Sequence, residues 1–151
     1  MSDSLPDPKI RIVTGDRLTA AEVYGVWKIR DVVFSVEQNC REEDPDDLDL
    51  LATTTHVWVE DEHGPTSYLR VLDHEEMPRI GRVCTRKEHR GQGLSGALME
   101  SVLERFGDRE TRLNAQAYLE GWYGRYGYVT DGPHFEEAGI DHVPMRRTAS
   151  S

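Results

Sequence analysis

A glycine-rich turn is the segment of this sequence best suited to hold an anion. It reads Arg90-Gly91-Gln92-Gly93-Leu94-Ser95 and lies between an expected strand, 79–85, and an expected helix, 94–106. Glycines permit positive φ and a close approach of the backbone to a ligand. The first amides of a helix have no internal partner, and the helix dipole attracts negative charge. With Arg86 and Lys87 beside it, the turn predicts a site for a phosphorylated ligand.

Two other interpretations of the turn stay open on these residues alone. Gly91-x-Gly93-x-x-Gly96 matches the letters of the dinucleotide-binding fingerprint. That fingerprint usually opens a doubly wound domain, with an acidic residue at the end of the next strand. Here only 151 − 91 = 60 residues follow, and the next expected strand ends in Asn114-Ala115-Gln116. The remaining interpretation is a glycine-rich helix start that binds no ligand.

An aromatic segment farther along the chain helps to choose among these interpretations of the turn. Residues 118–128 contain the pair Trp122-Tyr123 and, after two residues, Tyr126-Gly127-Tyr128. Together the two segments resemble the GNAT acetyltransferase superfamily. The turn is similar to its coenzyme A motif, Arg/Gln-x-x-Gly-x-Gly/Ala, and the aromatic segment is similar to its second signature. Ser95 departs from the glycine or alanine usual in the motif, but serine is small enough to fit.

The resemblance extends over roughly residues 20–146 and is to the ElaA-like branch of the superfamily. Residues 28–40 are similar to its Arg-x-x-Val-Phe-x-x-Glu-Gln-x-Cys segment. Further similar positions are Asp44, Asp47, His56, Gly81-Arg82-Val83, Ala115-Gln116-Ala117 and 139–145. Gln116 stands where many superfamily members have asparagine, in agreement with this branch.

The resemblance implies direct transfer of an acetyl group from acetyl-CoA to an amine of a small molecule or peptide in a ternary complex. It implies that the pantetheine arm adds like a strand along the residues that end at Thr85. Tyr123 matches the tyrosine that often protonates the leaving thiolate, although an aromatic core role is the alternative. The expected coenzyme-binding residues are Val83, Cys84, Thr85, Arg90, Gly91, Gln92, Gly93, Leu94, Ser95, Gln116 and Tyr123.

A protonated amine cannot attack, so the reaction also needs a proton acceptor. The candidates are Glu37, Asp44, Asp47, His56 and His142. We prefer Glu37 as the general base because it follows the first expected helix, where this fold usually lines the acceptor site. For each candidate a surface or salt-bridge role is the alternative.

Four residues are expected to contact the acceptor: Asp44, His56, Arg70 and His142. Arg70 and Arg82 would hold an acceptor carboxylate or pair with the acidic loop. Cys84 is interpreted as buried packing, because nothing nearby predicts an activated thiolate.

These side chains must be positioned by an alternation of strands and helices. Strands are expected at 10–14, 56–59, 68–72, 79–85 and 112–115, with a last hairpin joining 128–129 to 142–145. Helices are expected at 19–34, 94–106 and 118–126.

The first of these helices carries two local signals. Thr19 and Glu22 form a capping box at its start. Val23, Trp27, Arg30 and Phe34 recur at helical spacing and predict its buried face.

The order of elements predicts an α/β (α+β) fold, a single GNAT-like domain with a mixed central sheet flanked by helices. The domain is expected to span 9–147, with flexible ends at 1–8 and 148–151.

The composition limits the classes of binding partner that the protein is expected to have. The net charge, 18 − 28 = −10, argues against nucleic acid and anionic membranes and tolerates a cationic amine. Six acids within residues 42–49 are interpreted first as a solvated loop. Two cysteines, the absence of metal-ligand spacing and the lack of a signal-like N-terminus favour a cytoplasmic protein without a metal. A monomer or a homodimer is expected, and the alternative function is a non-catalytic coenzyme A-binding sensor.

Overall fold

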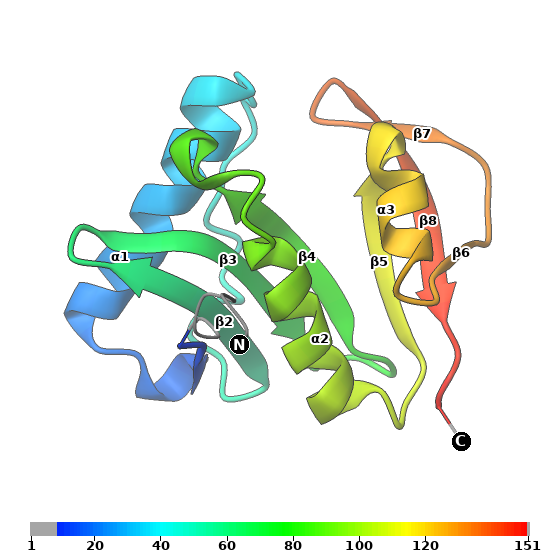
Figure 1. Cartoon of the computed structure of the whole chain (residues 1–151), viewed down its shortest axis with the longest axis horizontal. Coiled ribbons are helices and arrows are strands. Elements are labelled where there is room, and N and C mark those ends of the chain that lie inside the picture. The colour runs from blue at the N-terminus through cyan, green and yellow to red at the C-terminus, as the bar shows by residue number, and fades with distance from the viewer. Residues whose placement is uncertain (1–8, 151) are drawn as a thin grey trace, which may run out of the picture.

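A computed structural model of the chain describes residues 9–150, so the expected flexible segment 1–8 and Ser151 lie outside the described residues. Within this range eight strands form one mixed sheet in the order β1-β2-β3-β4-β5-β8-β6, with β7 paired to β8 (Figure 1). The predicted α/β class with a mixed central sheet is confirmed. The strands are β1 Arg11–Thr14, β2 Thr54–Asp61, β3 Gly64–Leu72, β4 Arg79–Thr85, β5 Thr111–Gln116, β6 Val129–Thr130, β7 Phe135–Glu137 and β8 Ile140–Arg147. The helices are α1 Ala20–Arg30, α2 Leu94–Phe106 and α3 Glu120–Gly124.

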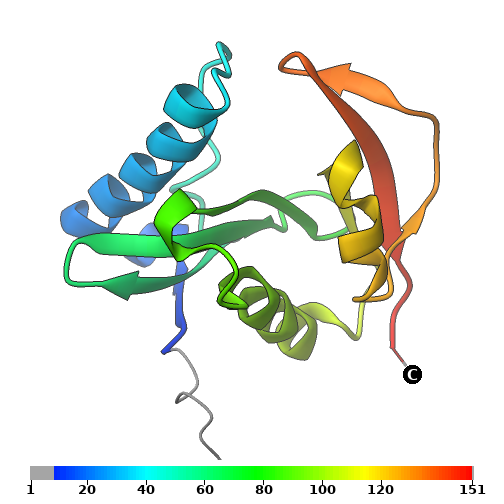
Figure 2. The same ribbon diagram turned by 45° about the horizontal axis from the view of Figure 1, so that its top comes forward.

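Helices α1 and α2 cover opposite faces of the strands β2, β3 and β4 (Figure 2). Side chains alternate across a strand, so neighbours along β2 and β3 serve different cores. Val57 and Leu69 pack under α2, whereas Trp58 and Tyr68 pack under α1. On α2, Leu98 has no exposed surface, and such a side chain contributes roughly 2 kcal/mol of hydrophobic stabilisation.

The first helix begins as predicted but buries a different face. The Thr19 hydroxyl accepts a hydrogen bond from the Glu22 amide, and the Glu22 carboxylate accepts one from the Thr19 amide. The buried positions are Val26, Ile29, Arg30 and Val33, and Trp27 is 55% exposed, so the predicted face was wrong by about one residue. Large apolar residues occur on both sides of this helix, and spacing alone did not separate them. Beyond Arg30 the helix continues as a π-helical segment, Asp31–Glu37.

The C-terminal part of the sheet contains one strand more than expected. The expected pairing of the 128–129 region with β8 is present, with Val129 opposite Arg146. The short strand β7, which pairs with the beginning of β8, was not predicted. Residues 148–150 form no helix or strand, and the Ser150 amide donates a hydrogen bond of 2.8 Å to the Gly107 carbonyl.

The sheet is split between its two central parallel strands. β4 and β5 pair only at Arg79 with Arg112 and at Ile80 with Leu113, and the strands diverge beyond these pairs (Figure 1). A β-bulge follows directly on β4, where Arg82 has a φ of 53° and the register with β3 shifts. The inner edges of both strands are therefore open toward their carboxyl ends, and the functional site lies between them.

Candidate active site

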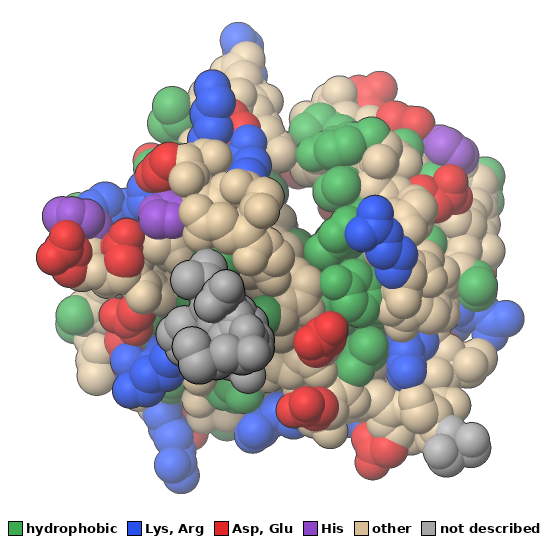
Figure 3. Space-filling model, viewed as in Figure 1, with side chains coloured by type: hydrophobic (Ala, Val, Ile, Leu, Met, Phe, Trp, Pro, Cys, Tyr) green, Lys and Arg blue, Asp and Glu red, His purple; other side chains and the backbone are tan. Residues whose placement is uncertain are grey.

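The split between β4 and β5 opens into a cavity of about 770 Å³. The space-filling view shows the molecule hollowed between its two halves, with hydrophobic side chains gathered over α3 on one wall (Figure 3). The other wall is formed by the carboxyl end of β4, the glycine-rich turn and the segment that follows α1. The cavity thus collects most of the residues that the sequence singled out.

The glycine-rich turn has the backbone geometry that a ligand cradle needs. Gly91 has a φ of 80° and Gly93 a φ of 75°, and no atom lies within 4 Å of the position that a Cβ would take on either residue. No side chain caps the N-terminus of α2. Its first amides therefore face open space at the positive end of the helix dipole. Leu94 lines the cavity, whereas Gln92 is exposed and does not.

Ser95, the residue that departs from the motif, connects the turn to β4 through a hydrogen bond. Its hydroxyl lies 2.7 Å from the Thr85 hydroxyl, which in turn lies 2.8 Å from the hydroxyl of buried Ser67. Glycine or alanine at this position would lack the bond to Thr85. The serine therefore strengthens the contact between strand and helix without closing the cradle.

Arg90, an expected coenzyme-binding residue, and Glu37, the expected general base, form an ion pair with each other. Both terminal nitrogens of Arg90 donate to the Glu37 carboxylate, at 2.5 and 2.6 Å, and Nε of Arg90 donates to the Thr85 carbonyl. The hydrogen bonds from Arg90 lower the pKa of Glu37 below its ordinary value. A carboxylate held in this way is a weak proton acceptor, so the geometry does not favour Glu37 as the base.

The strand residues of the expected coenzyme site also line the cavity. Val83, Cys84 and Thr85 lie along the open edge of β4. Gln116 projects from β5 and donates from its amide nitrogen to the Gln38 side chain at 3.1 Å, which links the two walls. Burial raises the pKa of the Cys84 thiol to about 12, in agreement with a packing role.

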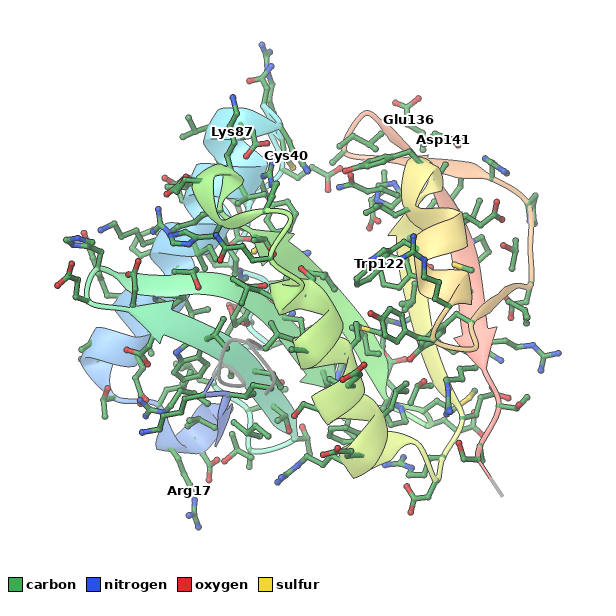
Figure 4. The ribbon with its side chains drawn as sticks, in the orientation of Figure 1. Arg17, Cys40, Lys87, Trp122, Glu136 and Asp141 are labelled. Carbon is green, nitrogen blue, oxygen red and sulfur yellow. The ribbon has the colours of Figure 1, made fainter. Side chains whose placement is uncertain are left out.

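Tyr123 lies deep in the cavity at 5% exposure. Its ring is held edge-on against Trp122 at 4.9 Å and against Tyr128 at 6.4 Å. Trp122 lies on the side of α3 that faces the space between the halves (Figure 4). Burial raises the pKa of Tyr123, and its hydroxyl makes no hydrogen bond to any residue of 9–150. The side chain therefore keeps a free proton beside the cavity.

The acidic segment 42–49 is a solvated loop in part, and three of its six acids, Asp44, Asp46 and Asp49, pair with arginines. Asp44 pairs with Arg30 and Arg82, and Asp49 Oδ1 accepts from Arg30 at 2.7 Å and from Arg70 at 2.9 Å. Asp46 completes the ion cluster by pairing with Arg70. Asp44, Arg70 and Arg82 line the cavity, but each already has an ion-pair partner within the cluster. Of the two roles predicted for Arg70 and Arg82, the structure displays the pairing with the acidic loop.

The two histidines expected at the acceptor site have different surroundings. His56 is fully buried on β2, outside the cavity, with Nδ1 at 2.7 Å from the Tyr68 hydroxyl and Nε2 at 2.8 Å from the Asp49 carbonyl. The prediction of an acceptor contact for His56 was therefore wrong, because both nitrogens support the packing of the acidic segment. His142 lines the cavity from β8. Asp47 is exposed and does not line it.

Comparison with known proteins decides the family. Residues 34–149 match the family model described as "Acetyltransferase (GNAT) domain". The chain belongs to the GNAT acetyltransferase family. It is an acyltransferase of the ElaA-like branch, which was the predicted branch.

Relatives and solved structures support this GNAT assignment along nearly the whole chain. A UPF0039 protein of Mycobacterium tuberculosis is 42% identical over 93% of this chain and 94% of its own length. Protein ElaA of Escherichia coli is 34% identical over 86% of this chain and 90% of its own. A crystal structure of an acyl-CoA N-acyltransferase from Pseudomonas aeruginosa superposes with a TM-score of 0.86 at 35% identity, covering 93% of this chain and 99% of that one.

Several residues lining the cavity of this GNAT domain were not singled out in the sequence. They are Gln38, Glu42, Glu43, Leu119, Trp122 and Glu137. Gln38 and Trp122 lie inside segments that carried the resemblance. Their position next to motif residues could therefore have identified them as candidate site residues. Glu137 lies on the unpredicted strand β7, and no pattern in the sequence marks it. No helix within residues 9–150 has both the length and the apolar character required to cross a membrane.

Proposed function

We propose that this acyltransferase moves an acetyl group from acetyl-CoA to the amine of a small molecule or peptide, by direct transfer in the cleft between β4 and β5. The observation that carries the proposal is the open inner edge of β4, which joins the glycine cradle and Tyr123 within one cavity. Family membership supports acyl transfer, and the 35% identical neighbour is described as an acyl-CoA N-acyltransferase.

The residues present fit coenzyme A. The open space at Gly91 and Gly93 and the uncapped start of α2 suit a pyrophosphate. Arg90 lines the same end of the cavity, and Arg86 and Lys87 precede it in the chain. The backbone of residues 83–85, unpaired on its inner edge, suits an extended amide-containing arm that adds like a strand. Acetyl-CoA supplies the acyl group as a thioester.

Tyr123 is the proposed general acid. A leaving thiolate needs a proton, and a tyrosine whose pKa is raised by burial keeps its proton at neutral pH. Because its hydroxyl is free of other partners among the described residues, it can turn toward a sulfur atom in the cavity. We retain the expectation of a monomer or a homodimer.

The proposal is tested by measuring thiol release from acetyl-CoA with a panel of primary amines, together with acetyl-CoA affinity by calorimetry. Wild-type protein should bind acetyl-CoA and release thiol only when an accepted amine is present. Tyr123→Phe should lower turnover about 10²-fold while acetyl-CoA affinity stays within about threefold, since general acids contribute about 10²–10⁴-fold.

Tyr128→Phe is the matched control. Tyr128 is also a buried tyrosine, but its hydroxyl bonds Thr111 at 2.7 Å and the residue does not line the cavity. This variant should lose some stability and keep its turnover. Equal turnover of Tyr123→Phe and wild type would remove the acid role, and tight coenzyme binding without turnover on any amine would favour the sensor function.

A further inference from the structure

In His142 one ring nitrogen is hydrogen-bonded, and the other makes no hydrogen bond within residues 9–150. It lies on β8 at 8% exposure, and Nδ1 is 2.7 Å from the Ile140 carbonyl oxygen. A carbonyl oxygen only accepts hydrogen bonds, so Nδ1 must carry the hydrogen. In the neutral imidazole the lone pair is then on Nε2. The backbone of β8 thus selects the tautomer in which Nε2 accepts a proton.

The surroundings of His142 hold this ring at the wall of the cavity. Phe135 stacks on it with the ring centres 5.7 Å apart and the planes 25° apart. On β5 the residue opposite is Gln116, which belongs to the expected coenzyme site. Nε2 has no hydrogen-bond partner within residues 9–150, and the Glu137 carboxylate lies 3.7 Å away. Glu136 and Asp141, labelled in Figure 4, mark the hairpin of β7 and β8 that carries this pair.

The other candidate bases lack a free basic atom in the cavity. Glu37 is bound by both terminal nitrogens of Arg90, and Asp44 pairs with two arginines. His56 is buried with both nitrogens hydrogen-bonded. Asp47 does not line the cavity. Among the five candidates, His142 is the one that lines the cavity and whose basic atom makes no hydrogen bond within residues 9–150.

We propose that His142 is the general base that takes the proton from the acceptor amine, directly or through one water, an inference that rests on the proposed function. The ammonium of the acceptor gives one proton to Nε2 and becomes the nucleophile. Its nitrogen forms a bond to the thioester carbon, and the carbon–sulfur bond breaks. The electron pair of that bond leaves on the sulfur, which takes the proton of Tyr123. The second proton shed by the nitrogen passes to the Tyr123 oxygen, directly or through water, and restores its hydroxyl. Glu137 is a positioning residue that faces the imidazolium once it is charged.

The experiment compares two acceptors that differ in their need for a base. A primary alkylamine, chosen from the series methylamine to hexylamine by its turnover with wild type, is protonated at neutral pH. Methoxyamine is not, so it attacks without first losing a proton. His142→Asn keeps an N–H donor near the Ile140 carbonyl and removes the basic Nε2. With the alkylamine, kcat/KM should fall about 10²-fold or more, and with methoxyamine less than about threefold.

His134→Asn is the matched control. His134 is an exposed histidine whose Nδ1 is 2.7 Å from Asp141, and it does not line the cavity. Its variant should behave as wild type with both acceptors. If His142→Asn does not fold, judged by its thermal transition, His142→Gln replaces it with the same expectation.

Equal losses on both acceptors, or no loss on either, would overturn the assignment of the base. A wild-type protein that releases no thiol with any amine would instead overturn the proposed function, and the assignment with it.

Discussion

Replacing Asp46 by asparagine should destabilise the protein in a pH-dependent way. Burial opposes ionisation of Asp46, but the hydrogen bond and the charge of buried Arg70 outweigh it and lower the pKa from the ordinary value of 3.8 to about 2. At about 1.36 kcal/mol for each pKa unit, the difference corresponds to about 2.4 kcal/mol. The Asp46 side chain is 29% exposed, so solvent screening reduces the expected contribution to about 1–2 kcal/mol.

The sign follows from the lowered pKa. The stabilisation is complete above the unfolded value of 3.8 and is lost as the pH falls through about 2. Urea unfolding at pH 7 should therefore give a midpoint lower than wild type by about 0.5–1 M for Asp46→Asn. The difference between the two proteins should shrink when the measurement is repeated at pH 3.

Asp47→Asn is the control for this experiment. Asp47 is the next residue, it is exposed, and it forms no ion pair with a described residue. Asparagine tolerates its φ of 67°. This variant should unfold with wild type at every pH. An Asp46→Asn midpoint equal to wild type at pH 7, or a difference of the same size at pH 3, would refute the role given to the ion cluster.

Three further variants test the glycine-rich turn, the ion pair of Glu37 with Arg90 and the contact of Gly15 with the acidic segment. Gly93→Ala should weaken acetyl-CoA affinity about tenfold or more by calorimetry, whereas Gly139→Ala, with a similar φ of 77°, should show only the strain of about 1 kcal/mol; equal affinities would place the cradle elsewhere. Glu37→Gln should lower the KM for acetyl-CoA two- to fivefold by removing an anion beside the turn. Its kcat should stay within about threefold, and a hundredfold loss would restore Glu37 as the base. Gly15→Ala should lower stability in urea by about 1–3 kcal/mol, since its Cβ would lie 2.2 Å from the Asp49 carbonyl oxygen. Gly121→Ala, with open space at its Cβ, should cost nothing.

The sequence predicted the fold well where a local signal and the tertiary structure agree. The capping box at Thr19, the two positive-φ glycines of the turn and the start of α2 all depend on residues close in the chain. On α1 the predicted buried position Arg30 is inside, but Trp27 is outside and Val26 and Ile29 are buried in its place. A hydrophobicity pattern cannot reveal that two aspartates of a later loop, Asp44 and Asp49, neutralise this buried arginine.

The candidate site was predictable in its coenzyme half and less so in its acceptor half. Residues 83–85 and 90–95 are contiguous, so their neighbourhood in space follows from their neighbourhood in sequence. For Glu37, by contrast, a salt-bridge role was left open, but nothing in the sequence identifies Arg90, 53 residues away, as its partner. His56 and His142 looked equivalent in the sequence. Only the tertiary hydrogen bonds distinguish a packed imidazole from one with a free nitrogen.

The split between β4 and β5 also bears on edge-to-edge pairing between molecules. A strand edge with unpaired amides and carbonyls is a template for a strand from another molecule, and aggregation through such edges is a common hazard. Here the open stretches, residues 81–85 and 114–116, face each other across a narrowing cleft. A single extended arm can enter such a cleft, whereas a whole sheet edge needs a long, continuous and exposed strand to pair with. The same divergence that exposes the two edges to a ligand therefore confines them to short stretches inside the cavity.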